Sequence, residues 1–146
     1  MKRMLSVLLA VVCIGSMALA AHAEAVVDIR VDDVAPDSGY FQPGILYKIP
    51  LYNGDKPLDD EVLEYFRIGV SAYYYNEDRD DYVSASKYIS RLDMVKERGV
   101  YVLYFMAKAG YSYSEPIDID ICFRSRDKDD KDVYYDDQVT ITIGYT

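Results

Sequence analysis

The sequence predicts an all-β protein, a small antiparallel β-sandwich of seven to nine strands with at most one short helix, near residues 58–65. Apolar and polar residues alternate with a period of two in successive stretches, as in strands that bury one face. Clusters of Gly, Pro, Asn and Asp separate these stretches and mark turns. A single segment could begin a helix. Together these observations favour two packed sheets.

Residues 1–23 have the pattern of a cleaved signal peptide. Lys2-Arg3 provides the positive start, Met4 to about Ala20 is apolar, and Ala21-His22-Ala23 fits the small-x-small cleavage rule. We therefore expect a secreted or periplasmic protein with one mature domain, residues 24–146, and no membrane-spanning segment after cleavage.

Cleavage changes the chemistry that the chain can support. Loss of Lys2 and Arg3 moves the net charge from −9 to −11, and such an acidic protein is repelled by nucleic acids and anionic membranes. His22 is the one histidine, so the mature chain lacks catalytic triads, Cys–His dyads and most zinc sites. Of two cysteines only Cys122 remains, which excludes an intramolecular disulfide. We predict a protein that is not an enzyme and needs no cofactor.

The first half of the mature chain alternates strands and turns. Val27, Ile29 and Val31 predict a strand over 27–31, and the Pro- and Gly-containing segment 35–44 predicts a loop. A second strand covers 45–51, where Pro50 indicates a free edge or a bulge. Asn53-Gly54 then marks a turn.

The middle of the chain contains the segment that could be helical. Residues 57–65 carry acidic residues where a helix begins, which suits one or two turns. Period-two alternation returns over 66–75 and predicts a strand, followed by a charged loop at 76–81. One or two short strands are expected around 82–89 and 91–96.

The last third predicts three more strands. Residues 99–107, GVYVLYFMA, form the longest apolar run of the mature chain and predict a central strand. A Gly/Tyr/Ser loop over 108–115 separates it from the regular alternation at 117–124. The charged segment 125–132 predicts a loop, and 139–145 predicts the final strand.

A short motif around Tyr101 resembles immunoglobulin-like domains. Glu97, Gly99, Tyr101 and Leu103 follow the acidic-x-small-x-Tyr-x-Cys order that opens strand F of those domains, with leucine in place of cysteine. The resemblance implies an immunoglobulin-like sandwich without the inter-sheet disulfide. It also implies that Tyr101 forms a tyrosine corner, in which its hydroxyl bonds to upstream backbone.

The same resemblance assigns neighbouring strands. Residues 66–75 would be strand C, 99–107 strand F and 116–124 strand G, with 137–145 as an added strand. Strands C and F are neighbours in such domains, so their outward side chains would share one face.

Tyrosine is the unusual residue of this chain, with 16 copies and no tryptophan. Tyrosine suits contact surfaces because it offers a large rigid area and a polar tip. The alternative is that these tyrosines are half-buried sheet residues favoured by β-propensity. The predicted binding face consists of Tyr73, Tyr75, Val102, Tyr104 and Met106, with Tyr111 and Tyr113 in the adjacent loop.

Two acidic loops suggest a different role. Carboxylate oxygens are the ligands that calcium prefers, although neither loop fits the twelve-residue calcium-binding pattern. A calcium-stabilised module using loops 76–81 and 127–132 is therefore the alternative function. Its candidate ligands are Asp78, Asp80, Asp127 and Asp129.

Ser84-x-x-Lys87 matches the start of the penicillin-recognising serine enzymes, but their companion motifs are missing. A small hydrolase using carboxylates or this Ser–Lys pair is the remote alternative.

Cys122 lies on the polar side of its strand and is either buried or available for an intermolecular bridge. The prediction is a non-catalytic binding or structural module of adhesion, envelope or assembly type, with a protein or glycan partner and possible oligomers.

Overall fold

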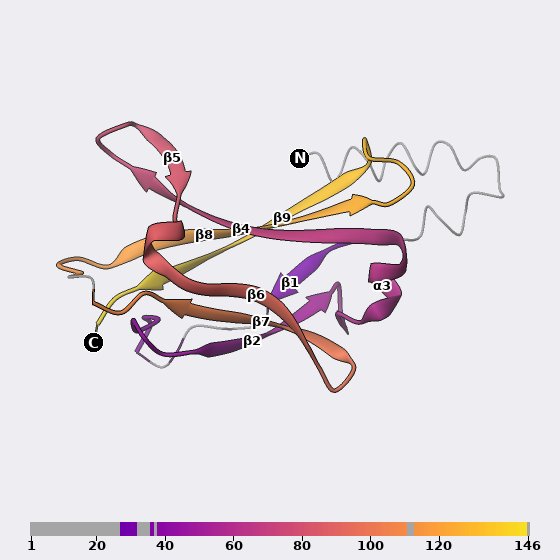
Figure 1. Cartoon of the computed structure of the whole chain (residues 1–146), viewed down its shortest axis with the longest axis horizontal. Coiled ribbons are helices and arrows are strands. Elements are labelled where there is room, and N and C mark those ends of the chain that lie inside the picture. The colour runs from indigo at the N-terminus through magenta and orange to yellow at the C-terminus, as the bar shows by residue number, and fades with distance from the viewer. Residues whose placement is uncertain (1–26, 32–35, 37, 111–112, 146) are drawn as a thin grey trace.

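A computed structural model describes residues 27–31, 36, 38–110 and 113–145. The predicted signal peptide, residues 1–23, lies outside the described residues, and so does Tyr111. Two antiparallel sheets pack face to face and form the predicted β-sandwich (Figure 1).

The strands divide between a five-stranded and a four-stranded sheet. The five-stranded sheet has the order β1 (Ile29–Val31), β2 (Tyr47–Asn53), β7 (Val100–Ala107) and β6 (Ile89–Glu97), with β3 (Lys56–Pro57) also paired to β2. The four-stranded sheet has the order β5 (Asp81–Ser84), β4 (Phe66–Asn76), β8 (Ile117–Asp127) and β9 (Tyr134–Ile143).

Helical structure in the described part is limited to short segments. The helix expected near 58–65 is α3 (Asp60–Tyr65), where Asp59 accepts a hydrogen bond from the Glu61 amide at 3.0 Å and so caps the helix. A 3₁₀ turn, η2 (Ser86–Tyr88), replaces the end of the strand predicted at 82–89.

The strand order is that of an immunoglobulin-like sandwich. With β1 as strand A, β2 as B and β4 as C, the order A-B-E-D faces C′-C-F-G, where C′ is the extra edge strand β5. This order makes β7 strand E, β8 strand F and β9 strand G. The fold class is therefore confirmed, but the assignments of 99–107 to strand F, 116–124 to G and 137–145 to an added strand are wrong by one position.

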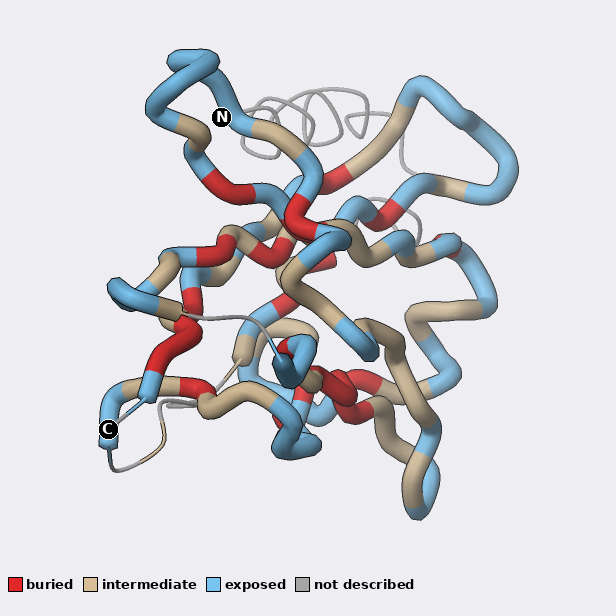
Figure 2. The backbone as a smooth tube through the Cα atoms, turned by 60° about the vertical axis from the view of Figure 1, so that its left-hand side comes forward, coloured by how far each residue is buried: buried red, intermediate tan, exposed pale blue. Residues whose placement is uncertain are grey.

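The core lies between the sheets and is built from alternate residues of each strand. Figure 2 shows buried and exposed residues alternating along the backbone. Phe105 of β7 packs edge-on against Phe41 with ring centroids 5.7 Å apart, and Phe66 packs against Tyr135 in the same way at 5.8 Å. Each fully buried side chain of this size stabilises the fold by roughly 2–3 kcal/mol through removal of apolar surface from water.

The segment before β2 contacts both sheets. β1 pairs with β2, and its Ile29 amide donates to Asp137 Oδ2 on β9 at 2.9 Å. Phe41 then forms a parallel bridge with Ile143, in which the Phe41 amide donates to the Thr142 carbonyl at 2.8 Å. This segment therefore links the five-stranded sheet to the edge of the four-stranded one.

The β8–β9 ribbon is longer than the sequence predicted. Residues 125 and 126 were expected in a loop, yet Ser125 pairs with Tyr135 and Arg126 with Tyr134. The charged side chains misled the prediction because they project outward from a strand that is buried on its other side. Ser125 is buried on the inner side, and its hydroxyl has no hydrogen-bond partner among the described residues.

A tight turn at Arg98-Gly99 joins β6 to β7. Both residues have positive φ, 54° and 84°, and the flanking Glu97 and Val100 pair with each other. Positive φ at both central positions is the requirement of a type I′ hairpin. The glycine of the motif around Tyr101 therefore serves this hairpin and does not mark the entry to strand F.

We expect Gly99→Ala to lower the free energy of unfolding by about 1–2 kcal/mol, because an L side chain is strained in the left-handed region. Arg98→Asn should leave stability equal or higher, since asparagine tolerates that region better. Urea unfolding at constant m-value measures both. Equal stability of Gly99→Ala and the parent protein would show that this turn has another conformation.

Candidate functional site

The predicted binding face is divided between the two sheets. Tyr73 and Tyr75 lie on β4 of the four-stranded sheet, whereas Val102, Tyr104 and Met106 lie on β7 of the five-stranded sheet. The outer faces of the two sheets point in opposite directions, so the structure does not bring these groups together. The error follows from reading β7 as strand F.

The β7 half of the predicted face is covered by neighbouring side chains. Tyr104 is only 9% exposed and Val102 only 8%, although both point away from the core. Lys48 of β2 lies 5.1 Å from the Tyr104 ring centroid and Arg91 of β6 lies 4.6 Å from it. The Tyr104 hydroxyl donates to the Glu97 carboxylate, which also pairs with Lys48 at 3.3 Å.

This arrangement gives Tyr104 a structural role. Two cations against the faces of one aromatic ring are attracted by its quadrupole, and their aliphatic stems remove apolar surface from water. Glu97 pairs with Val100, four residues before Tyr104 on β7. The Tyr104 ring and the Glu97 side chain therefore extend toward each other along the strand, because the Tyr104 hydroxyl reaches the Glu97 carboxylate. Side chains of β2 and β6 thus cover Tyr104 on the solvent side of β7. We exclude Tyr104 and the equally buried Val102 from the candidate surface.

The β4 half remains open to solvent. Tyr73 is 39% exposed, Tyr75 45% and Tyr82, its neighbour on β5, 58%. The Tyr75 and Tyr82 rings meet edge-to-face with centroids 5.4 Å apart. The Tyr75 hydroxyl donates to the Asp80 carboxylate, which raises the pKa of Tyr75 and keeps the phenol protonated.

A hollow of about 730 Å³ lies next to these tyrosines on the same outer face. Small residues on β4, Gly69 and Ser71, form part of its lining, together with Cys122 and Gln138 from β8 and β9. A Cβ atom built on Gly69 would meet no atom within 4 Å, so the space above this glycine is open.

A charged pair borders the hollow. Arg124 donates two hydrogen bonds to the Asp136 carboxylate, at 2.7 and 2.8 Å, and its guanidinium lies 4.4 Å from the Tyr134 ring centroid. The bond to Asp136 raises the pKa of Arg124, so the guanidinium stays charged. This bidentate geometry holds both side chains in fixed positions.

Sequence reasoning missed this pair. The alternation over 117–124 placed Arg124 on the outer side of its strand, which was the one available signal. Asp136 lay in a stretch with no assigned strand, and cross-strand register with Arg124 is set by the β8–β9 pairing.

We name the outer face of the four-stranded sheet the C′CFG face. Its outward residues on β5 and β4 are Tyr82, Ser84, Arg67, Gly69, Ser71, Tyr73 and Tyr75, and those on β8 and β9 are Asp118, Asp120, Cys122, Arg124, Arg126, Tyr134, Asp136, Gln138, Thr140 and Thr142. It is the candidate functional site.

The tyrosine corner predicted at Tyr101 is wrong. Its hydroxyl donates to Asp60 Oδ1 at 2.7 Å, a side-chain acceptor at the start of α3, and not to upstream backbone. The hydrogen bond from Lys96, together with the one from Tyr101, holds the pKa of Asp60 below its usual value. The Tyr113 hydroxyl instead donates to the Lys108 carbonyl five residues upstream, at 3.1 Å, just before strand F.

Carboxylates of the acidic loops form hydrogen bonds within the same part of the chain. Asp127 Oδ1 accepts from the amides of Asp129 and Asp130, at 2.8 and 3.1 Å, as in an Asx turn. Asp80 accepts the Tyr75 hydroxyl, and Asp78 is exposed in the loop between β4 and β5. Within the described ranges no three His, Cys, Asp or Glu residues gather in a way that could hold a metal ion. The calcium alternative therefore has no ligand cluster there.

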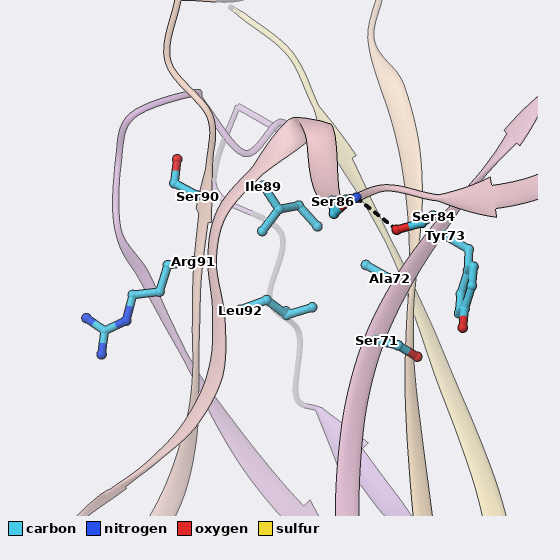
Figure 3. A pocket seen from close by; sticks show the side chains of 9 residues that line it. All are labelled: Ser71, Ala72, Tyr73, Ser84, Ser86, Ile89, Ser90, Arg91 and Leu92. Atoms are coloured by element: carbon cyan, nitrogen blue, oxygen red, sulfur yellow. Dashed lines mark hydrogen bonds between the residues drawn. The ribbon is translucent and has the colours of Figure 1, made fainter.

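Ser84, the serine of the Ser84-x-x-Lys87 match, lines a hollow of about 320 Å³ between the β4–β5 edge and β6, whereas Lys87 does not line it (Figure 3). Ile89 and Leu92 point into this gap, while Arg91 points away from it (Figure 3). The Ser84 hydroxyl accepts the Ser86 amide at 3.3 Å.

Lys87 is not placed to act as a general base. Its ammonium lies 5.3 Å from the Tyr74 ring centroid and 5.0 Å from that of Tyr88. Hydrogen bonding to Tyr74 raises the pKa of Lys87. A general base needs a lowered lysine pKa, so the geometry gives no support to the hydrolase alternative.

Cys122 is partly buried on the C′CFG face. Burial and the neighbouring carboxylates of Asp120 and Asp136 raise the pKa of its thiol. The thiol therefore stays protonated and weakly nucleophilic at neutral pH.

None of the helices in the described part is long and apolar enough to cross a membrane. No family model, curated protein or solved structure matches the chain.

We expect Tyr104→Ser to lower the free energy of unfolding by about 3 kcal/mol, because it removes a buried ring and its cationic neighbours lose their contact. Tyr104→Phe should cost about 1 kcal/mol, the value of one hydrogen bond. Tyr75→Ser, an exposed position on the other sheet, is the matched control and should change stability by roughly 0.5 kcal/mol or less. Chemical unfolding compares the three, and a harmless Tyr104→Ser would contradict the structural role of Tyr104.

Proposed function

We propose that the protein is a secreted or periplasmic, non-catalytic binding module whose contact surface is the C′CFG face. The observation that carries the proposal is the group of exposed tyrosines, Tyr73, Tyr75 and Tyr82, beside the hollow above Gly69. The residues that contribute most of the binding energy in protein interfaces are often rigid aromatic side chains beside a pocket.

The chemistry of the face favours a protein partner. Tyrosine and arginine are the residue types enriched in protein interfaces, and both are present here, with Arg124 held in place by Asp136. Sugar-binding surfaces often use tryptophan, which the chain lacks. The net charge of the mature chain opposes binding to nucleic acid.

The absence of histidine from the mature chain supports a role without catalysis, and the environments of Ser84 and Lys87 support it further. Binding through a rigid sheet requires no conformational change, so the module could act in adhesion, in the envelope or in assembly.

A photo-reactive benzoylphenylalanine at position 75 tests the surface in intact cells. Substitution at Tyr75 should give a covalent adduct with a partner protein, whereas the same group at Lys56, exposed in the five-stranded sheet, should not. Tyr73→Ser in the Tyr75-substituted protein should reduce the adduct yield several-fold. The absence of an adduct from position 75, or equal yields from positions 75 and 56, would overturn the proposal.

The proposed location has its own test. We expect protein isolated from the periplasm or the medium to begin at Glu24, because Ala21-His22-Ala23 fits the cleavage rule. Intact-mass measurement of each cell fraction reports the first residue. Uncleaved protein beginning at Met1 and confined to the cytosol would contradict the proposed location.

A further inference from the structure

The outward residues of β8 change the sign of their charge along the strand. In order they are Asp118, Asp120, Cys122, Arg124 and Arg126. The acidic end and the basic end of this row belong to the C′CFG face. Asp118 and Arg126 are eight residues apart, or about 26 Å at 3.3 Å per residue, so they cannot pair within one molecule.

The carboxylates at the acidic end have polar but uncharged partners. Asp118 accepts the Thr142 hydroxyl at 2.8 Å, and Asp120 accepts the Thr140 hydroxyl at 2.7 Å. Neither carboxylate forms an ion pair with a lysine or arginine of the described segments.

The basic end holds two arginines side by side. Arg67 of β4 is in register with Arg126 of β8, and like charges at directly opposed positions destabilise a sheet. Arg126 lies 5.6 Å from the Tyr134 ring centroid. No carboxylate of a described residue forms an ion pair with either arginine. Positive charge thus gathers locally on a protein that is acidic as a whole.

A two-fold axis along one row of this face would place each outward charge of β8 opposite a charge of the other sign. The row is Ser71, Cys122 and Gln138, which are in register across β4, β8 and β9. Two copies stacked outer face to outer face about this axis have antiparallel β8 strands. Asp120 of each copy then faces Arg124 of the other, and Asp118 faces Arg126. An axis along the strands would instead place like charges opposite each other.

The shape of β4 fits the same axis. Gly69 and Tyr73 lie two residues on either side of Ser71, so Tyr73 of each copy would face Gly69 of the other. Tyr73 is exposed, and the space above Gly69 is open. Arg67 and Tyr75 lie four residues on either side of Ser71, so Arg67 of each copy would face Tyr75 of the other. This brings an arginine against an exposed aromatic ring.

We propose that the C′CFG face binds a second copy of this chain, with Cys122 at the two-fold axis and the acidic end of each β8 against the basic end of the other. The inference rests on the proposed function, because it names the partner of the same surface. Strands of 11, 4, 11 and 10 residues, about 4.8 Å apart, give a face of roughly 600 Å². A standard interface buries about 800 Å² per partner.

Charge reversal at Asp118 and Arg126 tests the pairing in the purified mature protein. The unmodified chain should be a dimer by sedimentation equilibrium. Asp118→Arg and Arg126→Asp should each raise the dimer dissociation constant roughly tenfold or more, because each places like charges opposite each other. Lys56→Asp, which has the same charge change as Arg126→Asp but lies in the other sheet, should not alter the dissociation constant.

A double variant and a mixture of the two single variants distinguish the effect of charge pairing across the interface from the effect of net charge. The double variant D118R/R126D keeps the net charge of the parent chain and should restore the dimer. An equimolar mixture of the two single variants should form a heterodimer, since each arginine at position 118 then faces an aspartate at position 126. Circular dichroism verifies that each variant is folded.

Cys122 provides a second readout. Sheets packed face to face are about 10 Å apart, which exceeds the Cα separation of a disulfide. At mildly alkaline pH, where more of the thiol is ionised, a short bis-maleimide should link two copies of the unmodified chain through Cys122. It should not link Arg126→Asp at the same pH and concentration. Cys122→Ser should stay dimeric but lose the link.

A monomeric parent chain at 100 µM or so would overturn the inference, and so would a dimer that tolerates both single reversals. An adduct to a different protein from benzoylphenylalanine at position 75, with a monomeric parent chain, would sink the second-copy inference and keep the proposed function. No adduct from position 75 together with a monomer would remove both.

Discussion

Burial of one layer of side chains between two sheets is the constraint on which this protein depends. Cys122 is the one cysteine in the described part of the chain, so no disulfide there joins the sheets, and tryptophan is missing. Fully buried residues such as Leu103 and Phe105 on β7 and Ile121 on β8 therefore carry the stability of the sandwich. β7 and β8, like β2 and β4, lie inside their sheets, with a paired strand on each side.

Much of the fold could be predicted because period-two alternation follows directly from strand geometry. Residues 66–75, 100–107 and 117–124 all lie in strands, and α3 starts where acidic residues suit a helix. Alternation does not say which sheet a strand joins, and strands E and F both lie inside their sheets with an apolar inner face. The motif around Tyr101 led to the wrong assignment of this stretch to strand F. Its glycine belongs to the hairpin at Arg98-Gly99 and does not mark the start of strand F.

The candidate surface shows the same limit. Alternation correctly placed Tyr73, Tyr75 and Tyr104 on outer faces. Whether an outward tyrosine stays open depends on strands remote in the sequence: Lys48 and Arg91 cover Tyr104, while Gly69 and Ser71 leave room beside Tyr73. The two sheets thus treat the same residue type differently. In the five-stranded sheet Tyr104 is covered by its neighbours, whereas in the four-stranded sheet Tyr73 and Tyr75 are exposed to solvent.

The parallel bridge between Phe41 and Ile143 also has a mechanical meaning. Here the two strands run in the same direction, and the Phe41 amide and carbonyl both bond to the end of β9. A force that pulled the chain before Phe41 away from the chain after Ile143 would slide these strands past each other. Such shear loads the bonds together, whereas antiparallel strands pulled from their open ends separate one bond at a time. The bridge is therefore a point at which tension between these two segments would be resisted by shear.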